Sequence, residues 1–382
     1  MTDKTLPGGT KLNSKRILEL DALRAIAALN LLLFHFTWVY VAKYGFESPL
    51  GFCMPYGKYG VQLFFMLSGF VNAFTLLRKL PSPKDFTAGR IIRIVPSFWL
   101  VVTMNVFLLS LFPMLQQDVT PAKTLANMTV MPQLFGQVCM EPVSWTLMIE
   151  VLFYGFLLFL LFTGRLAKPL FSVVMVALMV CIVGGLGNQY IQNNYSTTSL
   201  ASISGFIERV MILRWFPLFA MGILLNEIKC KRGEFKLNAF GILLAGFAFH
   251  VIDVKDHNPA ATGVLFVLLT LCAYGKLPVL RFKPLLFIGS ISYSLYLFHN
   301  NIGTVFMSWL ESIGVPSLVA FLATFALVVW LSAQITFRFE QPVSKFLRSC
   351  YSKHKEFRKA TSPVNSGETR LARVMSTVPA RS

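Results

Sequence analysis

Ionisable side chains interrupt several long apolar stretches of this chain of 382 residues, and their types suit acid–base chemistry. Arg24 and His35 lie eleven residues apart in the first stretch, and Glu150 and His299 lie in later ones. An imidazole can gain or lose a proton near neutral pH, and a carboxylate can orient it. Because ionisable groups are costly within apolar segments, these four residues are candidate functional groups.

Helical geometry brings the two histidines and the glutamate to similar depths. Arg24 and His35 fall on one helical face, separated by roughly 16 Å along the axis. His35 and His299 each lie about 14 residues, or ~21 Å, from the start of their stretches. Glu150 reaches a similar height from the opposite side of a core ~30 Å thick. These groups could form an acid–base site, and the alternative for His35 is a structural hydrogen bond to a neighbouring helix.

The stretch that contains His299 is unusually polar, with serines, tyrosines and asparagines among its apolar residues. Ser292, Tyr296 and His299 share one helical face through their i,i+4 and i,i+3 spacing. Such a helix must line a cavity or face other helices. We interpret the serines as hydrogen-bonding groups between helices, and Tyr296 and His299 as candidate site residues.

Two further arginines, Arg90 and Arg93, lie on one helical face at the start of another apolar stretch. With Arg24 they predict a cationic cluster on one side of a membrane. Guanidinium groups suit phosphates because they donate paired hydrogen bonds. The alternative, which the spacing supports equally, is that these arginines mark the cytoplasmic ends of membrane spans.

The composition excludes a soluble enzyme and a disordered chain. Hydrophobic residues make up 55% of the chain and charged residues 14%, whereas soluble domains carry about 25% charged residues. The mean hydropathy is +0.62. The net charge of +18 does not indicate nucleic-acid binding, because the basic residues lie between long apolar runs.

Apolar runs of ~20 residues predict an all-α polytopic membrane protein with about ten transmembrane helices. The runs are continuous rather than alternating, which excludes a strand-based barrel. The predicted spans are 22–41, 59–77, 91–112, 145–163, 169–187, 208–228, 237–254, 261–275, 285–310 and 315–337.

The distribution of Lys and Arg predicts that both termini are cytoplasmic. Of the 35 such residues, 29 lie in the N-terminal segment, the even-numbered loops and the C-terminal tail, as the positive-inside rule requires. The six others are Lys43, Lys58, Lys123, Arg209, Arg214 and Lys255. Arg214 could contact a substrate from the outer side or pair with Glu208.

The chain divides into three predicted parts. Residues 1–20 form a cytoplasmic segment, 21–344 the membrane domain, and 345–382 a basic, disordered cytoplasmic tail that contacts anionic lipid. The cysteines show no CxxC or zinc spacing, so we expect no metal site. Cys53 and Cys139 both fall in predicted outer loops, where they could form a disulfide or stay unpaired.

The polar motifs, in their order along the chain, resemble those of the integral-membrane acyltransferase 3 family of O-acyltransferases. The motifs that carry the resemblance are Arg24 with His35; Gly60 to Phe70; Arg90-Ile-Ile-Arg93; Ser144-Trp145-Thr146-Leu147 with Glu150 and Phe153-Tyr154; Ser292-Tyr293-Ser294-Leu295-Tyr296-Leu297-Phe298-His299; and Glu340 with Pro342. Six matches in order across residues 21–342 make the resemblance specific.

The resemblance implies transfer of an acyl group, often acetyl, from cytoplasmic acyl-CoA to a sugar hydroxyl. The acceptor would be a lipid-linked or surface glycan, acyl-CoA would be a co-substrate, and no cofactor would be bound permanently. The chain would be the stand-alone form of the family, in contact with membrane lipids and located in a bacterial inner membrane.

Combining this implication with the predicted depths assigns a role to each residue. Arg24, Arg90 and Arg93 would bind the CoA phosphates. His35 would act as general base on the acceptor hydroxyl, and Glu150 would orient its imidazole or stabilise the charged form. Tyr296 or His299 would donate to the developing oxyanion. Direct transfer and an acyl-histidine intermediate are both open.

Three other functions are compatible with these residues. In a proton-coupled transporter, His35, Glu150 and His299 would form a relay. A non-enzymatic scaffold or sensor would not bind CoA. An acyltransferase could also act on an antibiotic, a lipid or another small molecule. The acyl chain, the accepting hydroxyl and the oligomeric state are not predicted by these motifs.

Overall fold

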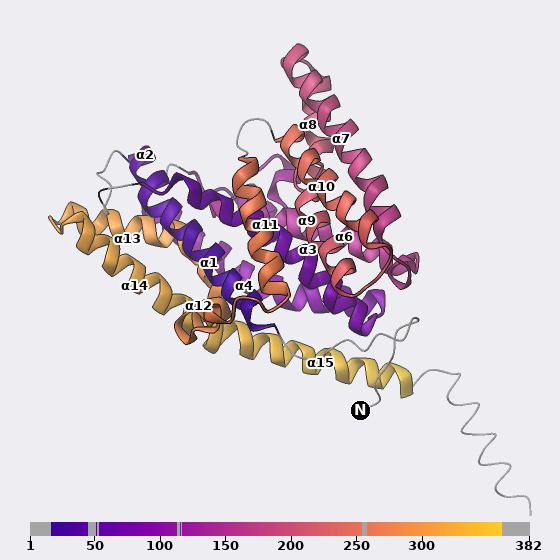
Figure 1. The fold of residues 1–382 in the computed structure, drawn as a ribbon. Coiled ribbons are helices and arrows are strands. Elements are labelled where there is room, and N and C mark those ends of the chain that lie inside the picture. Colours follow the sequence, from indigo (N-terminus) through magenta and orange to yellow (C-terminus); the bar gives the residue numbers. More distant parts are fainter. Residues whose placement is uncertain are drawn as a thin grey trace, which may run out of the picture.

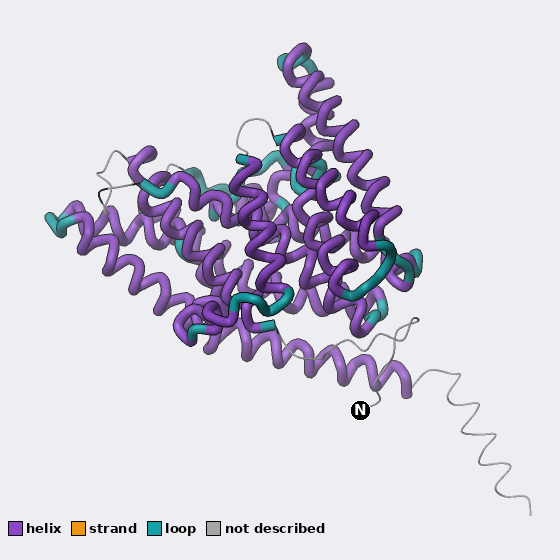
Figure 2. Tube along the Cα trace, viewed as in Figure 1, coloured by secondary structure: helices purple, strands orange, loops and turns teal. Residues whose placement is uncertain are grey.

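The computed structural model describes residues 17–44, 51, 53–112, 115, 117–253 and 258–360. Within these ranges every regular element is a helix, joined to the next by loops and turns, and no strand is present (Figure 2). The all-helical class predicted from the apolar runs is therefore confirmed.

The arrangement of the α-helices is drawn in Figure 1. Their bounds are α1 Leu18–Phe34, α2 Tyr40–Tyr44, α3 Gly60–Lys79, α4 Pro83–Leu111, α5 Pro121–Met128, α6 Trp145–Phe162, α7 Phe171–Asn194, α8 Ser199–Val210, α9 Phe216–Lys229, α10 Phe235–Ile252, α11 Pro259–Ala273, α12 Lys283–Phe298, α13 Asn300–Ser312, α14 Ser317–Ile335 and α15 Gln341–Ala360. Two π-helical turns, His35–Val39 and Thr336–Glu340, join α1 to α2 and α14 to α15.

Seven helical stretches in the described part of the chain are long and apolar enough to cross a membrane. They are Leu18–Tyr44, Pro55–Arg78, Pro83–Leu111, Pro142–Phe162, Phe171–Asn194, Phe235–Ile252 and Ser317–Phe357. The other three predicted spans correspond to shorter helices: α9 with 14 residues, α11 with 15 and α12 with 16. The count of ten and the cytoplasmic side of the termini stay predictions.

The structure differs from the prediction at the C-terminal tail. A disordered segment was expected from residue 345, but α15 continues to Ala360, and residues 361–382 lie outside the described part. α15 runs along the lower edge of the bundle in Figure 1. Tyr351 and Lys355 of this helix bond the Asp85 carboxylate at the start of α4, at 3.1 and 2.7 Å. These contacts hold α15 against the protein.

α4 contains Pro96, which has no N–H to donate to the carbonyl of Ile92 four residues earlier. Ser344 of α15 donates to that carbonyl with an O···O distance of 3.3 Å. α15 therefore satisfies a backbone group that the proline leaves unbonded, which matters where water is excluded.

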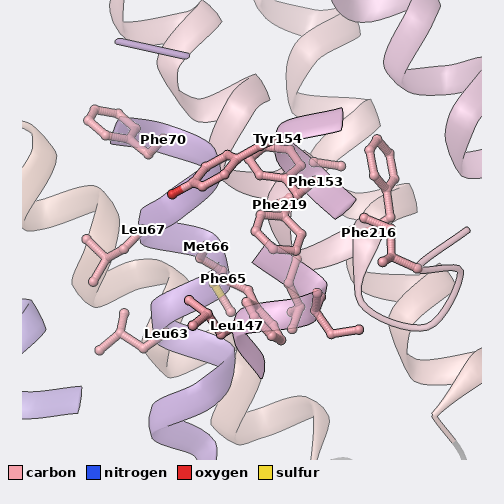
Figure 3. Close-up of a cluster of buried hydrophobic side chains, with 14 of the residues drawn as sticks. Leu63, Phe65, Met66, Leu67, Phe70, Leu147, Phe153, Tyr154, Phe216 and Phe219 are labelled. Atoms are coloured by element: carbon pink, nitrogen blue, oxygen red, sulfur yellow. The ribbon is translucent and has the colours of Figure 1, made fainter. Parts of the chain in front are cut away.

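The packed core lies between α3, α6 and α9 and is rich in aromatic side chains (Figure 3). The rings of Phe153 and Phe219 stack with centroids 4.0 Å apart, and Phe65 lies 4.9 Å from Phe219. α3 and α9 approach closely because glycines face the opposing backbone: a Cβ on Gly69 would lie 2.2 Å from the Phe219 carbonyl oxygen. Phe219 of α9 thus contacts both α3 and α6.

We predict that Gly222→Ala destabilises the protein, because its Cβ would lie 2.1 Å from the Met66 carbonyl oxygen. Overpacking of this kind costs about 1–3 kcal/mol. Thermal unfolding in detergent should show a melting temperature lowered by several degrees. Gly246→Ala is the matched control, since nothing lies within 4 Å of its Cβ position. Equal melting temperatures for the two variants would contradict the close packing.

Candidate functional site

His35 and His299, the two histidines predicted to belong to the site, are in contact. Nε2 of His299 lies 3.2 Å from Nδ1 of His35, and the ring centroids are 5.0 Å apart. His35 begins the π-helical turn that follows α1, and π-turns commonly occur at functional sites. His299 lies at the junction between α12 and α13. Both histidines therefore stand where a regular α-helix is interrupted.

Backbone carbonyls determine which ring nitrogens carry protons. Nδ1 of His35 lies 2.7 Å from the Leu31 carbonyl oxygen. Nδ1 of His299 lies 3.0 Å from the Leu295 oxygen and 2.8 Å from the Tyr296 oxygen. Because a carbonyl oxygen is an acceptor, each Nδ1 must be the donor.

This assignment leaves two nitrogens with lone pairs when both rings are neutral. Nε2 of His299 accepts from the Nδ1–H of His35, which is shared with the Leu31 carbonyl. Nε2 of His35 makes no hydrogen bond with any described residue and can therefore accept a proton. Sequence reasoning placed the histidines at one depth, and the structure places them in contact.

A cavity of 240 Å³, here the arginine cavity, brings the predicted cations together. Its polar lining comes from α1, α3, α4, α6 and α12 and includes Arg24, Ser68, Arg90, Arg93, Glu150 and Tyr296.

The arginine cavity carries an excess of positive charge. Nη1 of Arg24 pairs with the Asp21 carboxylate at 2.9 Å, whereas Arg90 and Arg93 form no salt bridge with a described residue. Arg90 lies over the rings of Phe86 and Tyr154, 5.0 and 4.7 Å from their centroids. Neither guanidinium group is held in a direct ion pair with a described carboxylate, although both interact electrostatically with Glu150.

Glu150 belongs to the arginine cavity and does not contact His35. Its Oε1 accepts from Ser68 Oγ at 3.3 Å and from the hydroxyl of Tyr154. The carboxylate also interacts electrostatically with Arg24, Arg90 and Arg93. The expectation that Glu150 orients the His35 imidazole is therefore not met, because the Leu31 carbonyl and His299 hold that ring.

A second cavity, here the histidine cavity, has a volume of 540 Å³ and is lined by His35. Its other polar and aromatic lining residues include Lys58, Tyr59, Gln62, Gln133, Trp145, Arg209, Arg214, Trp215 and Asp253. Val61 and Tyr296 line both cavities and separate them. The site therefore consists of two compartments with a wall of side chains between them.

The hydroxyl of Tyr296 is engaged in this wall. It donates to the Val143 carbonyl and lies 2.6 Å from Thr146 Oγ1. Neither Tyr296 nor His299 presents a free donor to an oxyanion in this arrangement, since the Nδ1–H of His299 is directed to backbone carbonyls. In this arrangement Tyr296 is a structural residue of the wall. His299 contacts the imidazole of His35 and can orient it.

A buried polar network beside the site was not predicted. Asn105 Nδ2 lies 3.4 Å from Oε2 of Glu141, and Asn301 donates to Asn105 and to the Met140 carbonyl. Burial raises the pKa of Glu141 to about 8. The sequence features that could have indicated this network are Glu141, directly before Pro142, and Asn105, within an apolar run. The network positions Val143, whose carbonyl holds Tyr296.

Two further predictions concern single residues. Cys53 and Cys139 are both free in this structure, which contains no disulfide between them. Arg214 pairs with Asp253 rather than with Glu208, which accepts instead from Asn188 at 2.6 Å.

Residues 17–337 match a family model described as an acyltransferase domain. Exopolysaccharide production protein ExoZ of Rhizobium meliloti (strain 1021) is 31% identical over 263 residues, which cover 64% of this chain and 76% of ExoZ. O-acetyltransferase OatA of Staphylococcus aureus (strain NCTC 8325 / PS 47) is 25% identical over 376 residues, which cover 88% of this chain and 58% of OatA. The chain thus spans little more than half the length of OatA. No solved structure matches the chain significantly.

We predict that Glu141 makes stability depend on pH. Its ordinary pKa is 4.5 and its pKa in the folded protein is about 8. Between these values the folded protein binds the proton and the unfolded chain does not, so the free energy of unfolding falls as pH rises from about 4.5 to 8. Melting temperatures measured across this window should fall less steeply for Glu141→Gln than for the wild type.

The control for this measurement is Glu234→Gln, which replaces an exposed glutamate at the start of α10. It should retain the wild-type slope. A Glu141→Gln variant with the full wild-type slope would show that Glu141 does not titrate in this range.

Proposed function

This chain belongs to the acyltransferase 3 family, and from that premise we propose that it moves an acyl group, in particular acetyl, from cytoplasmic acyl-CoA to a carbohydrate hydroxyl on the opposite side of the membrane. The observation that carries the proposal is the pair of cavities that meet at Tyr296. One contains arginines suited to an anionic donor, and the other contains a histidine suited to a hydroxyl acceptor.

The arginine cavity is the proposed donor site. Arg90 and Arg93 offer paired donors to phosphate oxygens, and Arg24 adds positive charge at the same mouth. The volume of 240 Å³ lies below the ~300–1,000 Å³ typical of pockets that enclose a whole ligand. We therefore place the narrow pantetheine arm inside the cavity and the nucleotide at its mouth. The Glu150 carboxylate lies among the guanidinium groups and reduces the repulsion between them.

His35 is the proposed general base. Its Nε2 takes the proton of the acceptor hydroxyl while the hydroxyl oxygen bonds to the thioester carbonyl carbon. The tetrahedral adduct then loses the C–S bond, and the imidazolium returns the proton to the departing thiolate. The products are an ester and CoA as a thiol. Attack by Nε2 itself, which would give an acyl-histidine, is the alternative route.

His299 is a positioning residue in this scheme. Its unprotonated Nε2 accepts the Nδ1–H of His35, which keeps the reactive lone pair on Nε2 of His35. When His35 becomes an imidazolium, the same hydrogen bond stabilises the charge, as a carboxylate does in a catalytic triad. A neutral partner serves here in place of a carboxylate.

The names of the relatives support a glycan acceptor. ExoZ is an exopolysaccharide production protein and OatA an O-acetyltransferase. An antibiotic, a lipid or another small molecule is the alternative acceptor. The proton-relay function lacks the contact that it requires, because Glu150 bonds Ser68 and Tyr154 rather than either histidine in the described structure.

We predict that His35→Asn lowers acyl transfer by about 10²- to 10⁴-fold, the usual contribution of a general base. The measurement is transfer of label from radioactive acetyl-CoA to glycan by purified protein. Binding of CoA should be unchanged, because His35 lines the other cavity. Label that remains on denatured wild-type protein, and is absent from the variant, would identify the acyl-histidine route.

The matched control is His250→Asn, since His250 is an exposed histidine in α10 that lines neither cavity. It should transfer acetyl at the wild-type rate. Near-normal transfer by His35→Asn would exclude His35 as the base.

We also predict that Arg90→Gln weakens binding of acyl-CoA by about 10- to 100-fold, because a charged hydrogen bond contributes about 1.5–3 kcal/mol. Calorimetry with CoA measures this effect without turnover. Lys84→Gln is the control, since Lys84 is exposed on the same helix and does not line the arginine cavity. If CoA binds both variants equally, the donor site lies elsewhere.

A further inference from the structure

The histidine cavity is lined by several basic residues, although it lies on the side of the protein that is predicted to be poor in Lys and Arg. Six Lys and Arg residues lie outside the basic segments and loops of the sequence. Three of them, Lys58, Arg209 and Arg214, line this one cavity. The positive-inside rule explains the basic loops but not these three residues, which lie on the depleted side.

The three cations are not equivalent. Arg214 is paired with Asp253, whose side chain is 3% exposed, and its guanidinium lies 4.9 Å from the Trp215 ring centroid. This pair builds the wall of the cavity. Arg209 is exposed and forms no salt bridge with a described residue. Its neighbour Glu208 interacts electrostatically with it, but the Glu208 carboxylate accepts its hydrogen bond from Asn188, at 2.6 Å. Arg209 is therefore the cation best placed to meet an anion.

Aromatic rings complete the lining. Trp145 and Trp215 both line the cavity, with ring centroids 5.2 Å apart. Their faces are apolar, while Gln62 and Gln133 in the same cavity carry groups that can bond hydroxyls. Flat apolar surfaces beside hydrogen-bonding groups match a sugar ring, which has C–H faces and a hydroxyl edge.

We propose that the histidine cavity binds an acidic carbohydrate, a sugar that carries a carboxylate or a phosphate near the hydroxyl that is acylated. This inference rests on the proposed function, in which His35 acts on a hydroxyl within this cavity. The anion pairs with Arg209, with Lys58 adding to the field, and the sugar ring packs against Trp145 and Trp215. The charge thus selects the acceptor and places its hydroxyl against His35.

The experiment measures binding without turnover, in the full-length His35→Asn protein in detergent. The probes are a uronic acid trisaccharide, the matching neutral hexose trisaccharide and a hexose 1-phosphate, followed by calorimetry. We expect the acidic trisaccharide to bind at least tenfold more tightly than the neutral one, with a preference that weakens as salt is raised. Tighter binding of the sugar phosphate would identify phosphate as the preferred anion.

Three variants of the His35→Asn protein test whether Arg209 causes the preference for the acidic trisaccharide. Arg209→Gln should remove the preference for the acidic sugar and leave binding of the neutral sugar unchanged. Arg209→Lys should retain most of the preference. Arg165→Gln, at a half-buried arginine outside the cavity that bonds Ser172, should behave as the parent. Equal binding of acidic and neutral sugars, or an undiminished preference in Arg209→Gln, would overturn the proposal.

The outcomes separate this inference from the proposed function. If wild-type protein transfers acetyl to neutral and acidic glycans with equal KM, the acyltransferase function stands and the acidic preference is wrong. If no acceptor is acylated but the acidic trisaccharide binds in an Arg209-dependent way, the cavity binds acidic sugars and the proposed reaction is wrong.

Discussion

Within the apolar thickness of a membrane, a backbone carbonyl that leaves the α-helical pattern must find its donor in the protein. The contact between the two imidazoles follows from this constraint. At the junction of α12 and α13, the Nδ1–H of His299 bonds the carbonyls of Leu295 and Tyr296. At the π-turn, the Nδ1–H of His35 bonds the Leu31 carbonyl. The groups that satisfy the backbone are thus the groups that fix the tautomers of the site.

Apolar runs predict the helices of this chain because burial in lipid requires length and continuity more than a particular residue order. The failures have local causes. Residues 208–228 are divided by a turn between α8 and α9, at Met211 to Trp215, which an apolar run does not reveal. The helix beyond residue 345 was missed because α15 is polar and its order depends on tertiary contacts with Asp85.

The sequence identifies which residues line the site more successfully than it identifies which of them are in contact. Arg24, Arg90 and Arg93 line one cavity, which agrees with the predicted cationic cluster. Glu150 was placed beside His35 because depth along a helix axis was the one coordinate that the sequence supplied. Depth does not fix the direction in which a side chain points, and Tyr296 lies between the two groups, lining both cavities. The sequence places Arg209 outside the basic segments and loops but assigns it no role, since a single cation forms no motif.

The thin wall formed by Val61 and Tyr296 has an electrical consequence. Membrane voltage falls across material of low dielectric constant. In the proposed function the donor and acceptor cavities open to opposite sides of the membrane, so the field would be concentrated over this wall. Moving one charge through 100 mV takes ~2.3 kcal/mol. In the proposed reaction the acyl group passes the wall as a neutral thioester, and CoA withdraws as a neutral thiol that carries the proton of the acceptor hydroxyl. The charged phosphates stay with the arginines. No net charge crosses the field, so the transfer does no electrical work and proceeds equally in an energised and a depolarised membrane.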